Sequence, residues 1–337
     1  MTCAWDILVD VPESIPFEGK MGYINSYKPA VQAELHGYYG PDPYDINWAF
    51  PLHENTLRSE RMILTPFQPS IHIDGLWKQM EAHPALQHWL PFDIATKDGL
   101  LAKIETRVRR DPGAVLFAIM AHDHANPAHS GGGGGSSSSA DTPPLYPGAD
   151  GGQVHQPSKA SAETTTTAMA GVIALIRASP ANLSAEIGWV IVFPAFQRTR
   201  VASNAVALLL RYCLELPSDS DSDSDSDSVS VNADANATDA APAPVRGLGL
   251  RRVQWLTHAG NEASRRTALR VGFREEGTLR WERVIAPGKV GNGIPIRDGD
   301  PLGGAHPSSH SVVLSLCVDD WEDGGGRECV GQLILAP

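Results

Sequence analysis

The stretch that decides the fold covers residues 186–205 and reads EIGWVIVFPAFQRTRVASNA. Its apolar first half predicts a buried strand that ends before Pro194, and the apolar spacing that begins at Val201 predicts a helix. Arg198 and Arg200 lie in the short turn between them. Backbone N–H groups of such a turn and of the first helical turn lack helical partners, and the helix dipole adds positive potential. The stretch therefore predicts an anion site suited to a diphosphate, the alternative being a solvated connector.

Two low-complexity segments interrupt the 337-residue chain, at about residues 122–166 and 217–244. The first is rich in Gly, Ser and Thr, and the second contains SDSDSDSDSDS. Neither holds enough large apolar residues to offset the entropy of ordering, so both are predicted to be disordered insertions. We expect an N-terminal extension over residues 1–50 and a single domain over residues 51–337.

Outside these segments, hydrophobic periodicity gives an order of strands and helices. Residues 58–70 are expected to form a strand followed by a turn, with breaks at Pro66 and Pro69. Further strands are expected at residues 114–120, 168–177, 185–193, 250–258, 273–285 and 311–318, and helices at 73–89 (split by Pro84), 96–109, from 201 onward and at 261–271. Residues 168–193 are predicted to form a hairpin. The order indicates an α+β fold with a mixed, mostly antiparallel sheet and one crossover.

Composition excludes several classes of protein. Seven aspartates in the second low-complexity segment account for much of the net charge of −12, and no basic stripe suited to nucleic acid is present. No apolar run is long enough to span a membrane, and the N-terminus lacks a signal-peptide pattern. The four cysteines show no paired spacing, so neither disulfides nor a metal site are expected. These features favour a cytoplasmic protein and are also compatible with a nuclear one.

Two motifs in fixed order resemble the GNAT superfamily of N-acetyltransferases, in particular the branch that includes the ribosomal-protein alanine acetyltransferases. In FPAFQRTRVASNAVALLL, Gln197 and Ala202 match the family signature of Gln or Arg, two residues, Gly, one residue, and Gly or Ala, but Arg200 replaces the central glycine. In NEASRRTALRVGFREEGTLRW, Asn261 and Ser264 match the family's asparagine and serine. The resemblance covers about residues 58–320 apart from the insertions. It implies the GNAT (acyl-CoA N-acyltransferase) fold, with acetyl-CoA as co-substrate between two splayed central strands.

The same resemblance assigns the residues that contact coenzyme A. The turn and first helical turn would bind the pyrophosphate, main-chain N–H groups at a break in strand pairing would polarise the thioester carbonyl, and the second motif would contact the pantetheine arm. These residues are Val190, Ile191, Val192, Gln197, Arg198, Thr199, Arg200, Val201, Ala202, Ser203, Asn261 and Ser264. Either Arg200 keeps an ordinary conformation and contacts a phosphate through its side chain, or coenzyme A binding is weakened; we favour the first.

Acyl transfer to an amine needs a base for the amine and a proton for the sulfur. Glu186 is the first candidate base, with an exposed strand position as its alternative, and Glu282 is the second. Ser264 is the candidate acid, although it can equally satisfy a helix end, and Asn261 is in any case a favourable N-cap residue. Trp189 lies an odd number of residues from Glu186, so a regular strand would turn it toward the core on the opposite face.

The function that we predict is transfer of an acetyl group from acetyl-CoA to a primary amine, directly and within a ternary complex. The acceptor is a protein N-terminus or a small amine, and no metal, nucleic acid or membrane is involved. The alternative is a catalytically silent acyl-CoA-binding or protein-interaction module. Arg200 in the glycine position favours that alternative, as does Ala268 near the place of a tyrosine that many relatives carry.

Overall fold

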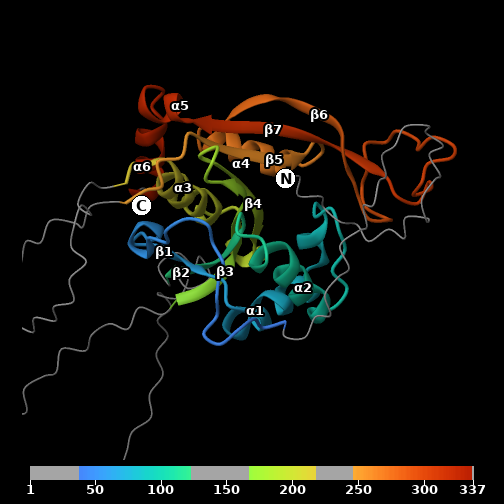
Figure 1. Ribbon diagram of the computed structural model, residues 1–337, viewed down its shortest axis with the longest axis horizontal. Helices are drawn as coiled ribbons and strands as arrows, with labels where there is room; N and C mark the ends of the chain where they lie inside the picture. The colour runs from blue at the N-terminus through green and yellow to red at the C-terminus, as the bar shows by residue number, and fades with distance from the viewer. Residues whose placement is uncertain (1–37, 123–166, 218–245, 336–337) are drawn as a thin grey trace, which may run out of the picture.

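The computed structural model describes residues 38–122, 167–217 and 246–335 (Figure 1). Within these residues seven strands form one sheet in the order β1-β2-β3-β4-β5-β7-β6. All neighbouring strands are antiparallel except β4 and β5, which are parallel. The predicted mixed, mostly antiparallel sheet with one crossover is confirmed. The two predicted insertions and residues 1–37 of the predicted extension lie outside the described residues, except for His122 and Pro217 at the insertion ends.

The strands follow the predicted positions closely. They are β1 (Met62–Pro66), β2 (Val115–His122), β3 (Thr167–Ser179), β4 (Ser184–Val192), β5 (Arg252–His258), β6 (Arg274–Val284) and β7 (Ser308–Cys317). Nearly every residue of β2 is buried, and so is the middle of β3. Strands of this kind need cover on both faces. The core of the protein therefore lies on both sides of the sheet at its centre.

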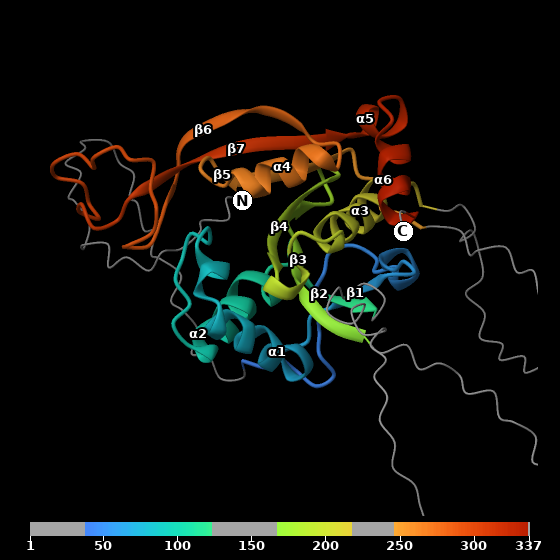
Figure 2. The ribbon, with the colours of Figure 1, turned by 180° about the vertical axis from the view of Figure 1, so that it is seen from behind.

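The helices are α1 (Pro69–Ala82), α2 (Lys97–Ile104), α3 (Val201–Leu214), α4 (Glu262–Arg270), α5 (Val318–Glu322) and α6 (Gly326–Leu335). Short 3-10 helices occur at Glu54–Leu57 (η1), Pro84–Gln87 (η2) and Pro194–Phe196 (η5), and a π-helical turn (η3, Glu105–Arg109) extends α2. Pro84 does split the first predicted helix, which begins earlier than expected because Pro69 takes a first-turn position. Figures 1 and 2 show α1 and α2 together near β1 to β3, with α3 and α4 beside β4 and β5.

The crossover between the parallel strands β4 and β5 runs through α3, the helix predicted from the opening stretch. All but a few residues of α3 are buried, because it packs on β4, on β5 and on α6. This arrangement fixes the first turn of α3 directly beyond the end of β4. The two halves of residues 186–205 therefore meet at one point of the sheet.

The C-terminal helices α5 and α6 were not predicted from the sequence. Helix α6 packs against α3 (Figure 2), and a buried amide holds the two together. Asn204, which is 1% exposed, donates from its Nδ2 to the Leu333 and Ile334 carbonyl oxygens at 3.1 and 3.4 Å, and its Oδ1 accepts from the Ser59 hydroxyl at 3.1 Å. Asn204 therefore joins the N-terminal part of α3 to the end of α6.

Replacing Asn204 by alanine should lower the free energy of unfolding by about 2 kcal/mol, because buried partners are left without a hydrogen bond. Denaturant titration of both proteins would measure this. Ser203→Ala is the matched control, since within the described part of the chain that hydroxyl bonds only to the nearby Arg200 carbonyl oxygen, at 3.1 Å. Equal midpoints for the two variants would contradict the proposed importance of the Asn204 amide.

Each undescribed internal segment leaves and rejoins the described chain at neighbouring residues. His122 ends β2 and pairs with Thr167 at the start of β3. On the other side, the Gly247 N–H donates to the Leu216 carbonyl oxygen at 3.2 Å, and the Gly249 N–H to the Glu215 carbonyl oxygen at 2.8 Å. The described fold is thus closed by hydrogen bonds at the base of both segments.

None of the described helices combines the length and the apolar character required to cross a bilayer.

Candidate functional site

The central feature of the site is the separation of β4 from β5. The two strands pair only from Ser184–Arg252 to Ile187–Trp255, although β4 continues to Val192 and β5 to His258. Beyond that point a cavity of about 610 Å³ opens between them. Most of its lining comes from β4, β5, α4, the turn before α3 with the first turn of that helix, and the segment after η2, and a few residues of η2, β3, β6 and β7 also contribute.

A bulge in β4 shapes one wall of this cavity. Two residue steps on β3, from Val172 to Ala174, correspond to three steps on β4, from Ile191 to Gly188. Within the bulge Trp189 has φ +50°, which is uncommon for a bulky residue. The predicted regular alternation of β4 is therefore wrong. Trp189 is 8% exposed, as expected of a core residue, but it lines the same cavity as Glu186.

The turn between β4 and α3 closes one end of the cavity. The Gln197 side chain donates to the Val192 carbonyl oxygen at 2.9 Å, which ties the turn to the end of β4. The Thr199 hydroxyl oxygen accepts from the Val201 N–H at 3.2 Å. The N–H groups of Ala202 and Ser203 follow in the first turn, where no intrahelical acceptor exists. These donors give this end of the cavity the character of an anion site.

Arg200 occupies the position of the family glycine without backbone strain. Its φ and ψ are −82° and −2°, in the right-handed region, so this position does not require a glycine. The favoured contact of the Arg200 side chain with a phosphate stays a prediction. The left-handed residue is instead Arg198, with φ +62°. Both arginines are exposed, but only Arg198 lines the cavity.

Nine of the twelve predicted coenzyme A contacts line this one cavity. They are Val190, Ile191, Val192, Gln197, Arg198, Thr199, Ala202, Asn261 and Ser264. Arg200, Val201 and Ser203 do not, because Arg200 turns outward while Val201 and Ser203 are buried in the packing of α3. The strand end and the two helix starts thus meet at one cavity.

The first turn of α4 combines a cap with a hydroxyl group at the cavity. The Asn261 Oδ1 accepts from the Ser264 N–H at 3.2 Å, so Asn261 is the predicted N-cap residue. The Ser264 Oγ accepts from the Trp255 indole N–H at 2.9 Å. All three residues line the cavity.

Glu186 is a buried carboxylate on the cavity wall rather than an exposed strand residue. It is 2% exposed, its Oε2 accepts from the Gln254 amide at 3.1 Å, and the Arg177 guanidinium lies 3.2 Å away. Burial raises the pKa of the Glu186 carboxyl, while the charges of Arg177 and Arg283 and the Gln254 hydrogen bond oppose that rise. The Glu282 carboxylate adds to it. Glu186 is therefore a better proton acceptor than an ordinary surface glutamate.

Glu282, the second candidate base, does not line the cavity. Its Oε2 accepts from the Arg283 guanidinium at 2.5 Å and from the Ser311 hydroxyl at 3.0 Å, and its Oε1 lies 3.6 Å from Arg177. Arg177 thus stands between the two carboxylates. This arrangement makes Glu282 a neighbour that influences Glu186 rather than an equivalent of it.

Several cavity residues were missed by sequence reasoning. Trp89 and Phe92 come from the segment between η2 and α2, and Phe92 packs against Trp189 with ring centroids 5.5 Å apart. Arg266 and Arg270 reach the cavity from α4. The arginines in SRRTALR were a visible signal, because a cationic helix beside a predicted phosphate site is a reasonable contact. The aromatic residues carried no local signal.

Ala268, near the position of the family tyrosine, is fully buried and does not line the cavity. Thr267 is the cavity-lining residue beside it. A side chain at position 268 of this helix therefore points into the core, and no described residue of α4 supplies a phenol to the cavity.

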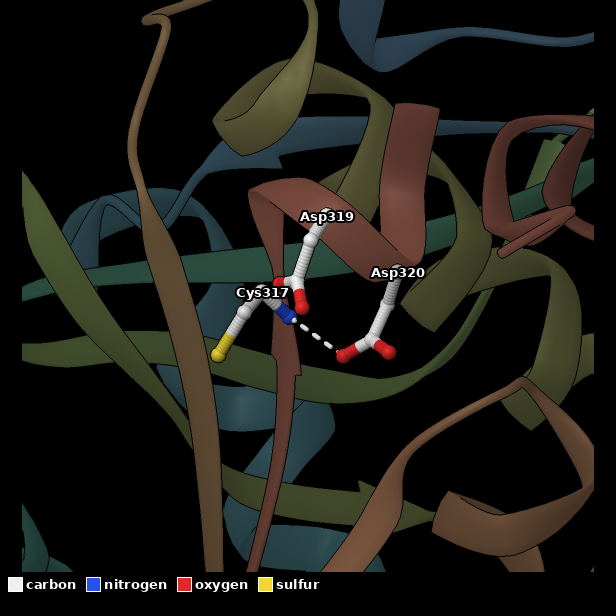
Figure 3. A group of neighbouring side chains, drawn as sticks. All are labelled: Cys317, Asp319 and Asp320. Carbon is white, nitrogen blue, oxygen red and sulfur yellow. Dashed lines mark hydrogen bonds between the residues drawn. The ribbon is translucent and has the colours of Figure 1, made fainter. Parts of the chain in front are cut away.

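Cys317, Asp319 and Asp320 form a group whose potential ligand atoms lie within 4.8 Å of one another (Figure 3). Their contacts are accounted for by the start of α5. The Asp320 Oδ2 accepts from the Cys317 N–H at 3.1 Å, closing a capping box, and its Oδ1 lies 2.7 Å from the Arg274 guanidinium. We therefore interpret the group as the N-terminal cap of α5, at the end of β7.

Comparison with known proteins gives one family match. Residues 150–274 match the model of the acetyltransferase (GNAT) domain, and the sheet described above is the GNAT fold. No curated protein matches the chain.

Several solved structures have a similar backbone arrangement. A probable GNAT-family acetyltransferase from Chromobacterium violaceum is 18% identical, covering 92% of this chain and 100% of its own, with a TM-score of 0.49. A GCN5-related N-acetyltransferase from Brucella melitensis is 19% identical, with coverages of 83% and 85% and a TM-score of 0.49. RimL, a ribosomal L7/L12 alpha-N-protein acetyltransferase in complex with coenzyme A, is 14% identical, with coverages of 77% and 96% and a TM-score of 0.42.

Proposed function

We propose that this protein is an acetyl-CoA-dependent N-acetyltransferase that transfers the acetyl group directly to a primary amine. The observation that carries the proposal is the composition of one cavity. It is lined at once by the first turn of α3, by the bulged segment of β4 and by the buried carboxylate of Glu186. These groups supply an anion site, main-chain donors and a base, which are the requirements of acyl transfer from a diphosphate-bearing thioester.

In this proposal the diphosphate of acetyl-CoA lies at the first turn of α3, near Arg198. The pantetheine arm follows the separated edge of β4 along Val190, Ile191 and Val192, toward Asn261 and Ser264. Arg200 remains close enough at the helix start to add positive potential from solvent. Main-chain N–H groups of the bulge polarise the thioester carbonyl.

The reaction is a direct aminolysis of the thioester. The acceptor nitrogen forms a bond to the carbonyl carbon, and the carbon–sulfur bond then breaks with its electron pair going to sulfur. Glu186, directly or through water, takes the proton that the nitrogen loses and returns it to solvent. The Ser264 hydroxyl donates a hydrogen bond to the departing thiolate, which takes a proton from water and ends as the thiol. The products are an amide and coenzyme A, with no covalent enzyme intermediate.

The acceptor that we propose is a protein α-amine, in keeping with the alanine acetyltransferase branch that the sequence resembles, or else a small amine. Calorimetric titration with acetyl-CoA, followed by an assay for thiol release with a panel of peptides and small amines, tests the proposal. Saturable binding together with amine-dependent thiol release is expected. Absence of both would contradict it.

A catalytically silent acyl-CoA-binding or interaction module is the second candidate, and it is favoured by one observation. The position of the family tyrosine holds Ala268, buried away from the cavity. A silent module would be stabilised thermally by coenzyme A but would release no thiol with any amine. The same two experiments therefore separate the candidates.

Replacing Arg198 by glutamine should weaken coenzyme A binding about tenfold, or about 1.4 kcal/mol, because a cation beside the diphosphate is lost. Calorimetric titration measures the change. Arg297→Gln is the control, since it removes one exposed positive charge from a residue that does not line the cavity. If both variants bind coenzyme A equally well, Arg198 is not part of the phosphate site.

A further inference from the structure

A hydrogen bond joins the side chains of Trp255 on β5 and Ser264 on α4. The indole Nε1 donates to the Ser264 Oγ at 2.9 Å, and both side chains line the cavity. The bond therefore joins a strand and a helix across the edge of the proposed site. The Trp255 side chain belongs to the buried core, with 3% exposure.

The direction of this bond limits what the serine can do. An indole N–H can only donate, so the Ser264 oxygen must act as the acceptor in this pair. One lone pair of the oxygen is then occupied, and the hydroxyl proton turns elsewhere. A serine held in this way serves as a donor and is a poor proton acceptor.

The competing backbone acceptors near Ser264 already receive hydrogen bonds. A serine in a first helical turn commonly bonds a carbonyl three or four residues earlier. Here the Asn261 carbonyl oxygen accepts from the Arg265 N–H at 3.1 Å, and the Gly260 carbonyl oxygen accepts from the Glu262 N–H at 3.1 Å. Each of these oxygens has a second lone pair, but among the described residues neither accepts a hydrogen bond from the Ser264 hydroxyl. The hydroxyl proton is therefore available to a group in the cavity.

Both partners are held firmly in place. Trp255 pairs with Ile187 and Leu314 on the neighbouring strands, and its ring meets the edge of Phe273 with centroids 5.7 Å apart. The Ser264 main chain is fixed by the Asn261 cap at 3.2 Å. A hydrogen bond between two such groups orients the hydroxyl without further loss of side-chain entropy.

We infer that Trp255 is a positioning residue, whose indole N–H holds the Ser264 hydroxyl as a hydrogen-bond donor toward the sulfur of bound coenzyme A. This inference rests on the proposed function, because it requires coenzyme A in the cavity. A donor at this position stabilises the thiolate more than the thiol. It therefore increases the acidity of the bound thiol.

The test is a titration of the thiol of bound coenzyme A, followed by the ultraviolet absorbance of its thiolate. Trp255→Phe keeps an aromatic ring in the core but removes the N–H, and Ser264→Ala removes the hydroxyl. Each variant should make the bound thiol about tenfold less acidic than in the wild type, or about one pKa unit. The double variant should equal Ser264→Ala alone, because Trp255 acts only through the serine.

Trp48→Phe is the matched control. Its indole N–H also donates to a hydroxyl, that of Tyr212 at 3.1 Å, but Trp48 does not line the cavity. We expect this variant to lose a similar amount of stability and to leave the bound thiol unchanged. The comparison distinguishes loss of the orientation of the Ser264 hydroxyl from a general loss of stability.

Two results would overturn the inference while leaving the proposed function intact. One is that the thiol of coenzyme A bound to Trp255→Phe has the same pKa as the thiol bound to the wild type. The other is a double variant in which the pKa shifts of the bound thiol caused by the two single substitutions add together. Failure of the wild type to bind coenzyme A would overturn the proposed function as well. The calorimetric binding titration, which precedes the thiol titration, would reveal that failure.

Discussion

Glu186→Gln is expected to lower amine-dependent thiol release by at least about a hundredfold, the usual contribution of a positioned base. Glutamine keeps the shape of the side chain but cannot accept the proton that the amine loses. Coenzyme A affinity should change little, because Glu186 lies on the wall of the cavity away from the turn that forms the anion site. Initial rates and calorimetric titrations of both proteins measure the two quantities.

The pH dependence of turnover provides a second measure of Glu186. The base works only when ionised, so activity is present above its raised pKa and is lost as the pH falls through that value. Glu282→Gln should move this acid limb to lower pH, because the Glu282 charge contributes to raising the pKa of Glu186. If turnover falls a hundredfold in Glu282→Gln and only slightly in Glu186→Gln, then Glu282 is the base and Glu186 is not.

The second large effect is expected at Gly171 on β3, opposite the bulge of β4. A Cβ atom at this position would lie 2.1 Å from the Ile191 carbonyl oxygen, a backbone atom that cannot move aside by itself. Gly171→Ala should therefore cost at least about 3 kcal/mol of stability. It should also weaken coenzyme A binding, because the displaced strand carries Val190, Ile191 and Val192.

Gly277→Ala is the matched control for Gly171→Ala. The two glycines have similar backbone angles, with φ +151° at Gly277 and +156° at Gly171, but nothing lies within 4 Å of a Cβ atom at Gly277. Denaturant titration of both variants thus distinguishes the loss of stability caused by steric overlap with β4 from the loss caused by the backbone angle alone. Equal losses of stability would mean that close approach to β4 is unimportant.

The sequence predicted most of the fold because its signals are local. Pro194 and the spacing after Val201 marked the end of β4 and the start of α3, and Asn261 marked the cap of α4. Helices α5 and α6 were missed because they are short and are separated by glycines that resemble a loop. They form through packing on α3, in which Asn204 takes part, and nothing near Asn204 in the sequence indicates its partners.

The site was predictable where a motif lies on one continuous stretch. The bulge at Trp189 was not, because a left-handed tryptophan has no signature in its own neighbourhood, and the bulge arises from the pairing of β4 with Val172 and Ala174 on the adjacent strand. Phe92 reaches the cavity only through tertiary packing. The contact of Arg177 with Glu186 likewise joins two strands, and the buried environment of that carboxylate follows from the sheet as a whole.

The closed bases of the two undescribed internal segments have a consequence for the history and the engineering of this chain. Because each segment departs from and returns to adjoining residues, its length is nearly uncoupled from the fold. Such points tolerate the gain or loss of whole stretches, and even of foreign domains. A reporter protein placed between His122 and Thr167, or between Pro217 and Arg246, would be joined to an intact scaffold of the GNAT fold. The sheet would then carry an inserted protein with which it makes no specific contact.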